Sequence, residues 1–278
     1  MLYIEDKLKE ALAAQGFSSY NSFIEYKGGL RVSRKSKRDV RTIELLVGGK
    51  KKNYFIKLAR VEPFKRVLQS IRKSQFPHSK VLKELQMLKF FEEQNIPVMR
   101  AMAWGEKCIL GWPVSGFLLL EEVKGKEFVE LFKKSGSRVR RQMMRGYGAL
   151  VGHVHKKGIN AKVRPRDIIC VSDDFSDYSK AFVLIDRERG NPFPVDMPMK
   201  KCAAQLATLL TKSIQNIGMP EKGELLAFLV GYFSGNRAFY EKRNEFVSIA
   251  AARIKQLMEK QERYKEIRET LLRKYQLR

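Results

Sequence analysis

Residues 54–106 read YFIKLARVEPFKRVLQSIRKSQFPHSKVLKELQMLKFFEEQNIPVMRAMAWGE, and this stretch decides the fold. It opens with aromatic and β-branched residues around Lys57, which is typical of a strand. From Ser79 the apolar residues recur at helical spacing, so we expect a helix over 79–94 with Ser79 as its cap. Glu84 lies on the inward edge of that helix, 27 residues after Lys57. The stretch therefore predicts a strand lysine that meets a helix carboxylate.

The sequence around this stretch changes from strands to helices. Before and after the 79–94 helix, β-branched runs predict strands, with Gly48-Gly49 as a hairpin turn. These strands are expected at 23–26, 42–47, 54–59, 99–106 and 116–123. Apolar periodicity predicts the helices, and the basic run 31–39 is interpreted as a turn. The helices are expected at 2–15, 64–76, 135–157, 198–216, 221–234 and 236–276.

This order predicts an α+β, protein-kinase-like fold with two lobes. A small β-rich lobe with one helix of the regulatory type would comprise residues 1–123. A mainly helical lobe would comprise residues 124–278 and end in a long basic helix. A lysine in the third strand and a glutamate in the following helix are the pair that a kinase uses on nucleotide phosphates.

The composition is strongly basic. The chain has 278 residues with 55 Lys and Arg against 30 Asp and Glu, a formal net charge of +25. Such a balance favours a polyanionic partner, which could be nucleic acid, an anionic membrane surface or a phosphorylated substrate. We find no RNA-binding or helix-turn-helix signature, which makes nucleic acid the weakest of the three.

Compartment and metal sites can also be read from the composition. Three widely spaced cysteines, with no Cys-x-x-Cys pattern, favour a reducing compartment and argue against a zinc site. The first residues do not resemble a signal peptide, and no apolar run is long enough to span a bilayer. We therefore expect a cytoplasmic protein, with peripheral contact at the cytosolic face of the inner membrane left open.

The segment FVLIDRERG, residues 182–190, predicts a cation site. An apolar strand that ends in an acid and is followed by a polar turn is what a magnesium-holding aspartate needs, and Asp186 occupies that position. The competing interpretation is an aspartate that only caps the turn at the end of the strand.

The segment HVHKKGINAKVRPRDIICV, residues 153–171, has the length and position of a kinase catalytic loop. Kinase loops usually carry H-x-D-x-x-x-x-N, in which Asp handles the acceptor proton and Asn binds a metal. In the register we favour, Asn160, Lys162 and Asp167 take the positions of His, Asp and Asn. In the alternative register, residues 164–167 replace H-R-D and Asp167 is the base. We interpret His153 and His155, in the preceding helix, as packing or solvent-facing residues.

Short motifs then point to one family. The turn NIPV at 95–98, AWGE at 103–106, HKKGIN at 155–160 and LIDRER at 184–189 resemble segments of the lipopolysaccharide kinase family, which includes heptose and Kdo kinases. The resemblance covers roughly residues 50–215.

The resemblance implies ATP-dependent transfer of a phosphate to a sugar hydroxyl of an anionic glycolipid, with Mg²⁺ as the metal. Lys57 would bind the nucleotide phosphates and Glu84 would orient Lys57. Asp186 and Asp167 would hold magnesium. The backbone of Glu121, Glu122 and Val123 would meet the adenine.

A second hypothesis is a kinase-like pseudoenzyme that binds nucleotide, an anionic membrane or a protein partner without turnover. Lys162 at the position of the usual base, and the run GGLRVSRKSKRD with only two glycines where a phosphate-covering loop is expected, motivate it.

Overall fold

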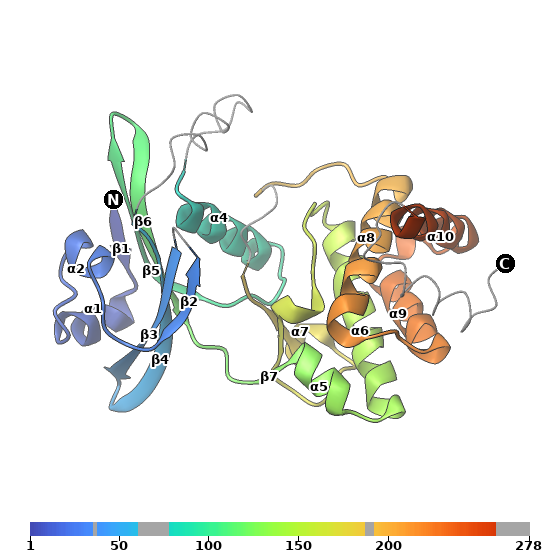
Figure 1. Ribbon diagram of the computed structural model, residues 1–278, viewed down its shortest axis with the longest axis horizontal. Coiled ribbons are helices and arrows are strands. Elements are labelled where there is room, and N and C mark those ends of the chain that lie inside the picture. The colour runs from blue at the N-terminus through green and yellow to red at the C-terminus, as the bar shows by residue number, and fades with distance from the viewer. Residues whose placement is uncertain (36–37, 61–77, 187–191, 260–278) are drawn as a thin grey trace. The chain divides into compact units, whose positions relative to one another are not determined.

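The computed structural model describes residues 1–35, 38–60, 78–186 and 192–259 (Figure 1). The chain divides into two compact units. The first comprises Met1–Lys124 with Val183–Pro192, and the second comprises Gly125–Phe182 with Phe193–Arg278.

The first unit is built on a six-stranded antiparallel sheet. Its strand order is β1-β5-β6-β4-β3-β2. The strands are β1 (Leu2–Ile4), β2 (Arg31–Lys35), β3 (Arg38–Val47), β4 (Lys50–Ala59), β5 (Ala101–Ile109) and β6 (Trp112–Glu121). Its described helices are α1 (Asp6–Ala13), α2 (Tyr20–Ile24) and α4 (Lys80–Glu93). Apart from the edge strand β1, this is the expected β-rich lobe with one helix of the regulatory type.

Each face of this sheet is covered by helices. Figure 1 shows α1 and α2 on one face and α4 on the other. Since side chains alternate along a strand, Ile56 and Leu58 of β4 pack with the α1 and α2 side, whereas Lys57 points to the side of α4. The core under α4 is formed by Val81, Leu85, Leu88, Trp104, Leu118 and Leu120.

The α4 helix confirms the expected capped helix. Ser79 is its N-cap, and the Ser79 hydroxyl accepts a hydrogen bond of 3.4 Å from the amide of Leu82. Ser79 is itself buried, and its own amide donates to a carboxylate oxygen of Glu106 at 2.6 Å. The start of α4 is therefore fixed to β5 by a charge-assisted hydrogen bond.

Three local expectations about the first unit are wrong. Residues 2–4 form an edge strand paired with β5 rather than the first turn of a helix, and the helix begins only at Asp6. Phe23 and Ile24 end the short helix α2 rather than open a strand, because a Ser19–Ser22 capping box starts a helix there. The basic run 31–39 is not a turn alone, since β2 and the start of β3 lie within it. The expected helix at 64–76 lies outside the described residues.

The second unit is mainly helical. Its main helices are α5 (Phe128–Lys134), α6 (Ser137–Lys156), α8 (Met199–Ile217), α9 (Lys222–Gly235) and α10 (Arg243–Glu259). Its shorter elements are β7 (Lys126–Glu127), η1 (Pro165–Asp167), β8 (Ile168–Cys170), α7 (Tyr178–Ala181) and η2 (Arg237–Phe239). The last helix begins at Arg243 rather than at 236, because η2 precedes it, and residues 260–276 lie outside the described ranges. No helix in the described ranges is both long and apolar enough to cross a bilayer.

The α6 and α9 helices pack at backbone distance. A Cβ atom at Gly231 of α9 would overlap the carbonyl oxygen of Arg145 of α6, and one at Gly148 of α6 would overlap that of Phe228 of α9. Gly152 and Gly235 face the partner backbone in the same way. Glycine is therefore required for the close contact that positions α6, the helix that precedes the expected catalytic loop.

Candidate active site

A buried ion pair joins β4 to α4 in the first unit. Lys57 Nζ lies 2.6 Å from Glu84 Oε1. The side chain of Lys57 is 10% exposed and that of Glu84 is fully buried. Taking two charges out of water is costly and returns little stability, so a pair of this kind is better explained by function than by folding.

Asp186 joins the same pair. Its Oδ1 lies 3.2 Å from Lys57 Nζ, and its side chain is 43% exposed. The strand β9 (Phe182–Leu184) positions it, because the amide of Leu184 donates to Pro97 and its carbonyl accepts from Met99, at 2.9 and 3.0 Å. Asp186 itself adopts a φ of 59°, a left-handed conformation that Asp tolerates better than most residues. The structure thus brings together three residues that the sequence singled out.

This constellation fits a magnesium–phosphate ligand. Carboxylate oxygens are the donors that Mg²⁺ prefers, and an ammonium beside them complements phosphate oxygens. Among the described residues no three His, Cys, Asp or Glu side chains are grouped so that they could hold a metal by themselves. In proteins, one or two carboxylates commonly share Mg²⁺ with water and substrate phosphates.

The expected adenine-binding segment follows β6. The amide of Glu121 donates to the carbonyl of Arg100 at 3.0 Å, and the amide of Glu122 donates to that of Asn53 at 3.1 Å. Val123 packs against the core under α4, and its amide has no hydrogen-bond acceptor within the described ranges. Of the three expected residues, Val123 is therefore the one whose N–H is available to a base.

Lys162 and Asp167 belong to the second unit. Asp167, at the end of η1, is buried, and Arg164 Nε lies 2.7 Å from its Oδ2. Arg166 Nε approaches its other oxygen at 3.7 Å. Lys162 is exposed between the buried residues Ala161 and Val163. The loop thus carries one buried carboxylate that contacts two arginines, and two exposed cations, Lys162 and Arg166.

A buried histidine anchors the start of this loop. His155 Nε2 lies 3.0 Å from Gln205 Oε1 of α8, and the Gln205 amide donates to the Asn160 side chain. His155 Nδ1 lies 2.9 Å from the Tyr232 hydroxyl. Burial lowers the pKa of His155 to about 4, against a smaller opposing effect of Gln205. His155 is therefore neutral at pH 7 and acts as a packing residue; sequence reasoning missed Gln205, which has no local motif.

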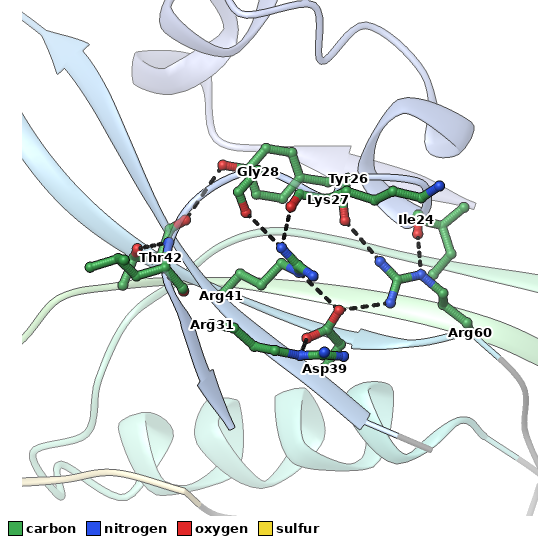
Figure 2. A network of polar contacts seen from close by, with 10 residues as sticks. Ile24, Tyr26, Lys27, Gly28, Arg31, Asp39, Arg41, Thr42 and Arg60 are labelled. Atoms are coloured by element: carbon green, nitrogen blue, oxygen red, sulfur yellow. Dashed lines mark hydrogen bonds and ion pairs between the residues drawn. The ribbon is translucent and has the colours of Figure 1, made fainter. Parts of the chain in front are cut away.

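A second polar network, also missed from the sequence, lies on the opposite face of the sheet from Lys57. Figure 2 shows Asp39, at the start of β3, surrounded by Arg31, Arg41 and Arg60 at 2.8, 2.9 and 2.9 Å. Burial raises the pKa of Asp39, but the hydrogen bonds from the three arginines outweigh burial and lower that pKa to about 2. A single acid within a basic run was the signal that could have found it.

The arginines of this network also hold the chain between α2 and β2. Arg60 donates to the carbonyls of Ile24 and Tyr26 at 3.0 and 2.8 Å, and Arg41 donates to those of Lys27 and Gly28 (Figure 2). The network therefore fixes the base of the β2–β3 hairpin to the segment that follows the N-terminal helices.

The sheet order, the strand lysine and the helix glutamate define a protein of the protein-kinase-like class. The chain belongs to the lipopolysaccharide kinase (Kdo/WaaP) family, whose family model matches residues 31–232. This match is wider than the 50–215 expected from the short motifs. The α+β fold class and the family resemblance read from the sequence are thus confirmed.

Solved structures show the same fold. One described as "WaaP in complex with acyl carrier protein" aligns with a TM-score of 0.62 and 20% sequence identity, covering 92% of this chain and 99% of that one. At this identity the likeness concerns the fold. A comparison with curated proteins found no match.

Proposed function

We propose that this protein is an ATP-dependent kinase that transfers the γ-phosphate to a sugar hydroxyl of an anionic glycolipid of the lipopolysaccharide type. The observation that carries the proposal is the buried Lys57–Glu84 pair with Asp186 beside it. Family membership supports the acceptor class.

Each side chain of the first unit has a role in nucleotide binding under this proposal. Lys57 contacts the α- and β-phosphates, and Glu84 holds the ammonium in place. The Val123 amide donates to the adenine, next to the backbone of Glu121 and Glu122. Asp186 and Asp167 would hold Mg²⁺, which would supply charge neutralisation for the nucleotide phosphates.

The transfer step is a displacement at phosphorus. The sugar oxygen forms a bond to the γ-phosphorus, the bond to the β,γ-bridging oxygen breaks, and ADP leaves. In the register we favour, Lys162 offers positive charge to the transferring group, and the hydroxyl proton passes to solvent or to the product phosphate. In the alternative register, Asp167 takes that proton. A loose transition state depends mainly on positioning and charge, so either arrangement supports transfer.

The acceptor is expected at an anionic surface. A net charge of +25 suits a phosphorylated, membrane-held glycolipid, and supports a peripheral position at the cytosolic face of the inner membrane. Since a similar structure is described in complex with acyl carrier protein, acyl carrier protein is a further partner that we propose to assay.

A pseudoenzyme is the second candidate function. It is favoured by Lys162 at the position of the base and by the close ion pair of Asp167 with Arg164, which would have to yield for the carboxylate to bind a metal. In that case the protein would bind nucleotide, membrane or a protein partner without phosphoryl transfer.

The test is transfer of labelled phosphate from ATP to lipopolysaccharide core acceptors by the purified full chain. Lys57→Ala is expected to abolish nucleotide binding and transfer, and Lys51→Ala, an exposed lysine of the same strand, is the matched control. Asp167→Asn separates the two registers, because loss of a metal ligand is relieved by excess Mg²⁺ whereas loss of a base is not. Unchanged nucleotide binding in Lys57→Ala would overturn the role assignment. Nucleotide binding without transfer would leave the pseudoenzyme.

A further inference from the structure

The hairpin formed by β5 and β6 extends beyond the rest of the sheet. Pairing of β4 with β6 ends at Ala59 and Gly116, whereas β5 and β6 continue to pair as far as Ile109 and Trp112. Figure 1 shows this hairpin extending past the ends of the neighbouring strands. Its turn is therefore a convex projection of the first unit.

The end of this hairpin is apolar and exposed. Leu110 is 92% exposed and Ile109 is 55% exposed, and Trp112 is half-buried beside them. We call Ile109, Leu110 and Trp112 the apolar tip. Leu110 and Gly111 have φ values of 49° and 78°, the pattern of a two-residue turn that favours Asn-Gly or Asp-Gly. A leucine there is strained and gains nothing from burial within the described residues, which points to a contact outside the chain.

Positive charge gathers at the same end of the sheet. Asp39 pairs with Leu58, near the end of β4, so Asp39 and the arginines that contact it lie at the end of the sheet from which the apolar tip projects. Arg31 and Arg60 keep 36% and 38% of their side chains exposed although both contact Asp39. Three arginines around one aspartate leave two positive charges uncompensated.

The apolar tip and the positive charge near it favour a lipid bilayer over a protein as the partner. A stable protein interface buries about 800 Å² on each side, which a projection of three apolar side chains cannot supply. A bilayer gains free energy from each apolar side chain that enters it, and each cation adds attraction to anionic head groups. Tryptophan is also suited to the interfacial layer, because its ring is apolar and its N–H is polar.

We propose that the apolar tip inserts into the interfacial layer of an anionic lipid bilayer, while Arg31 and Arg60 beside Asp39 face the head groups. This goes beyond phosphoryl transfer, because the contact needs neither nucleotide nor a competent catalytic loop. It orients the first unit, and with it Lys57, at the surface that holds a glycolipid acceptor.

The test is binding of the full chain to vesicles in the absence of ATP. Vesicles of phosphatidylcholine alone are compared with vesicles that contain phosphatidylglycerol. Leu110→Glu is expected to weaken binding to the anionic vesicles at least about tenfold, since one leucine side chain is lost from the bilayer. The matched control is Leu46→Glu, because Leu46 is 62% exposed in the same sheet but lies beside the turn at its other end.

A spectroscopic readout isolates the tip. The chain has two tryptophans, and Trp104 is buried while Trp112 is at the tip. In a Trp104→Phe background, emission from Trp112 is expected to shift to the blue on anionic vesicles and to stay unchanged on neutral ones. Thermal melts of each variant show that it is folded.

Three results would overturn the proposal: no binding of wild type to anionic vesicles, equal binding of Leu110→Glu and wild type, or Trp112 emission that does not shift on anionic vesicles. Because vesicle binding is measured without nucleotide, its failure is distinct from a failure of the kinase proposal.

Discussion

Lys57 Nζ and Glu84 Oε1 lie 2.6 Å apart although 27 residues separate them in the chain, and Glu84 has no exposed surface. The pair joins the third strand of the kinase-like sheet, counted from β2, to α4. Asp186 approaches the same ammonium at 3.2 Å from the far end of β9. Under the proposed function, Lys57 would exchange part of its contact with these two carboxylates for contact with phosphate oxygens.

The first prediction concerns Glu84→Gln. The substitution keeps the shape of the side chain but removes the charge that orients Lys57, so we expect kcat/KM for ATP to fall about a hundredfold. Steady-state kinetics with purified protein measure this effect. Glu92→Gln, an exposed position of the same helix, is the control and is expected to leave kcat/KM unchanged. Equal rates for Glu84→Gln and wild type would contradict a role in orienting the lysine.

The second prediction concerns Asp39→Asn. The variant keeps the volume but leaves three arginines without their counter-ion, and we expect a loss of about 2–3 kcal/mol of unfolding free energy. This loss is smaller than that expected for a fully buried ion pair, because two of the arginines are more than a third exposed. Since the pKa of Asp39 is lowered to about 2, the network's contribution is complete above the unfolded pKa of about 4 and is lost as pH falls toward 2.

Urea unfolding at pH 7 and at pH 3 checks this prediction. The difference between wild type and Asp39→Asn should shrink at the lower pH, because at pH 3 Asp39 is mostly protonated in the unfolded chain but still charged in the folded protein, so part of the network's contribution is already lost. Asp6→Asn, whose side chain is 93% exposed, is the control and should change stability little. A difference that is the same at both values would show that the ion pairs are not its source.

The third prediction concerns the contact of α6 with α9. Gly231→Ala places a methyl group on the carbonyl oxygen of Arg145, so we expect a loss of more than about 3 kcal/mol of unfolding free energy. Gly223→Ala in the same helix meets only the flexible side chain of Arg141 at 3.3 Å. There the better helix propensity of Ala should stabilise by about 0.5–1 kcal/mol. Melting curves of the two variants should therefore move in opposite directions.

The fourth prediction is a pH dependence that comes from His155. Its pKa is lowered to about 4 in the folded protein, so the unfolded chain binds the proton more readily. The contribution of neutral His155 is complete above the unfolded pKa of about 6.5 and is lost as pH falls toward 4, by about 3 kcal/mol in total. Unfolding free energies measured between pH 7 and pH 4.5 should fall less steeply in His155→Gln than in wild type. Parallel slopes would show that another group is responsible.

Much of the site could be predicted because its residues lie in regular elements. Lys57 and Glu84 sit in a strand and a capped helix whose patterns are local, and Asp186 ends an apolar strand. The sequence could not assign the residues that support these elements. The Gln205 side chain donates a hydrogen bond to Asn160, which lies 45 residues earlier in the chain. No sequence motif near Gln205 predicts this contact.

The N-terminal layer shows the same limit. Leu2–Ile4 became an edge strand because β5 offers a partner, which only the folded sheet reveals. The three arginines around Asp39 come from β2, β3 and the end of β4, so a run that is merely basic in the sequence becomes a specific network once the strands pair. The run 31–39, which contains β2 and the start of β3, was interpreted as a turn because its many charged residues obscure the alternation of apolar and polar residues that is typical of a strand.

The most direct test of the nucleotide site is a thermal melt with ATP, with and without Mg²⁺, on wild type and on Asp186→Asn. At an ATP concentration of 100 times Kd, binding stabilises the folded state by about 2.7 kcal/mol, which corresponds to a rise of Tm of roughly 5 °C or more. We predict that wild type shows this rise only with Mg²⁺ and that Asp186→Asn loses it. A wild type whose Tm does not respond to Mg²⁺ and ATP, or a variant that responds equally, would contradict a nucleotide site built on Lys57, Glu84 and Asp186.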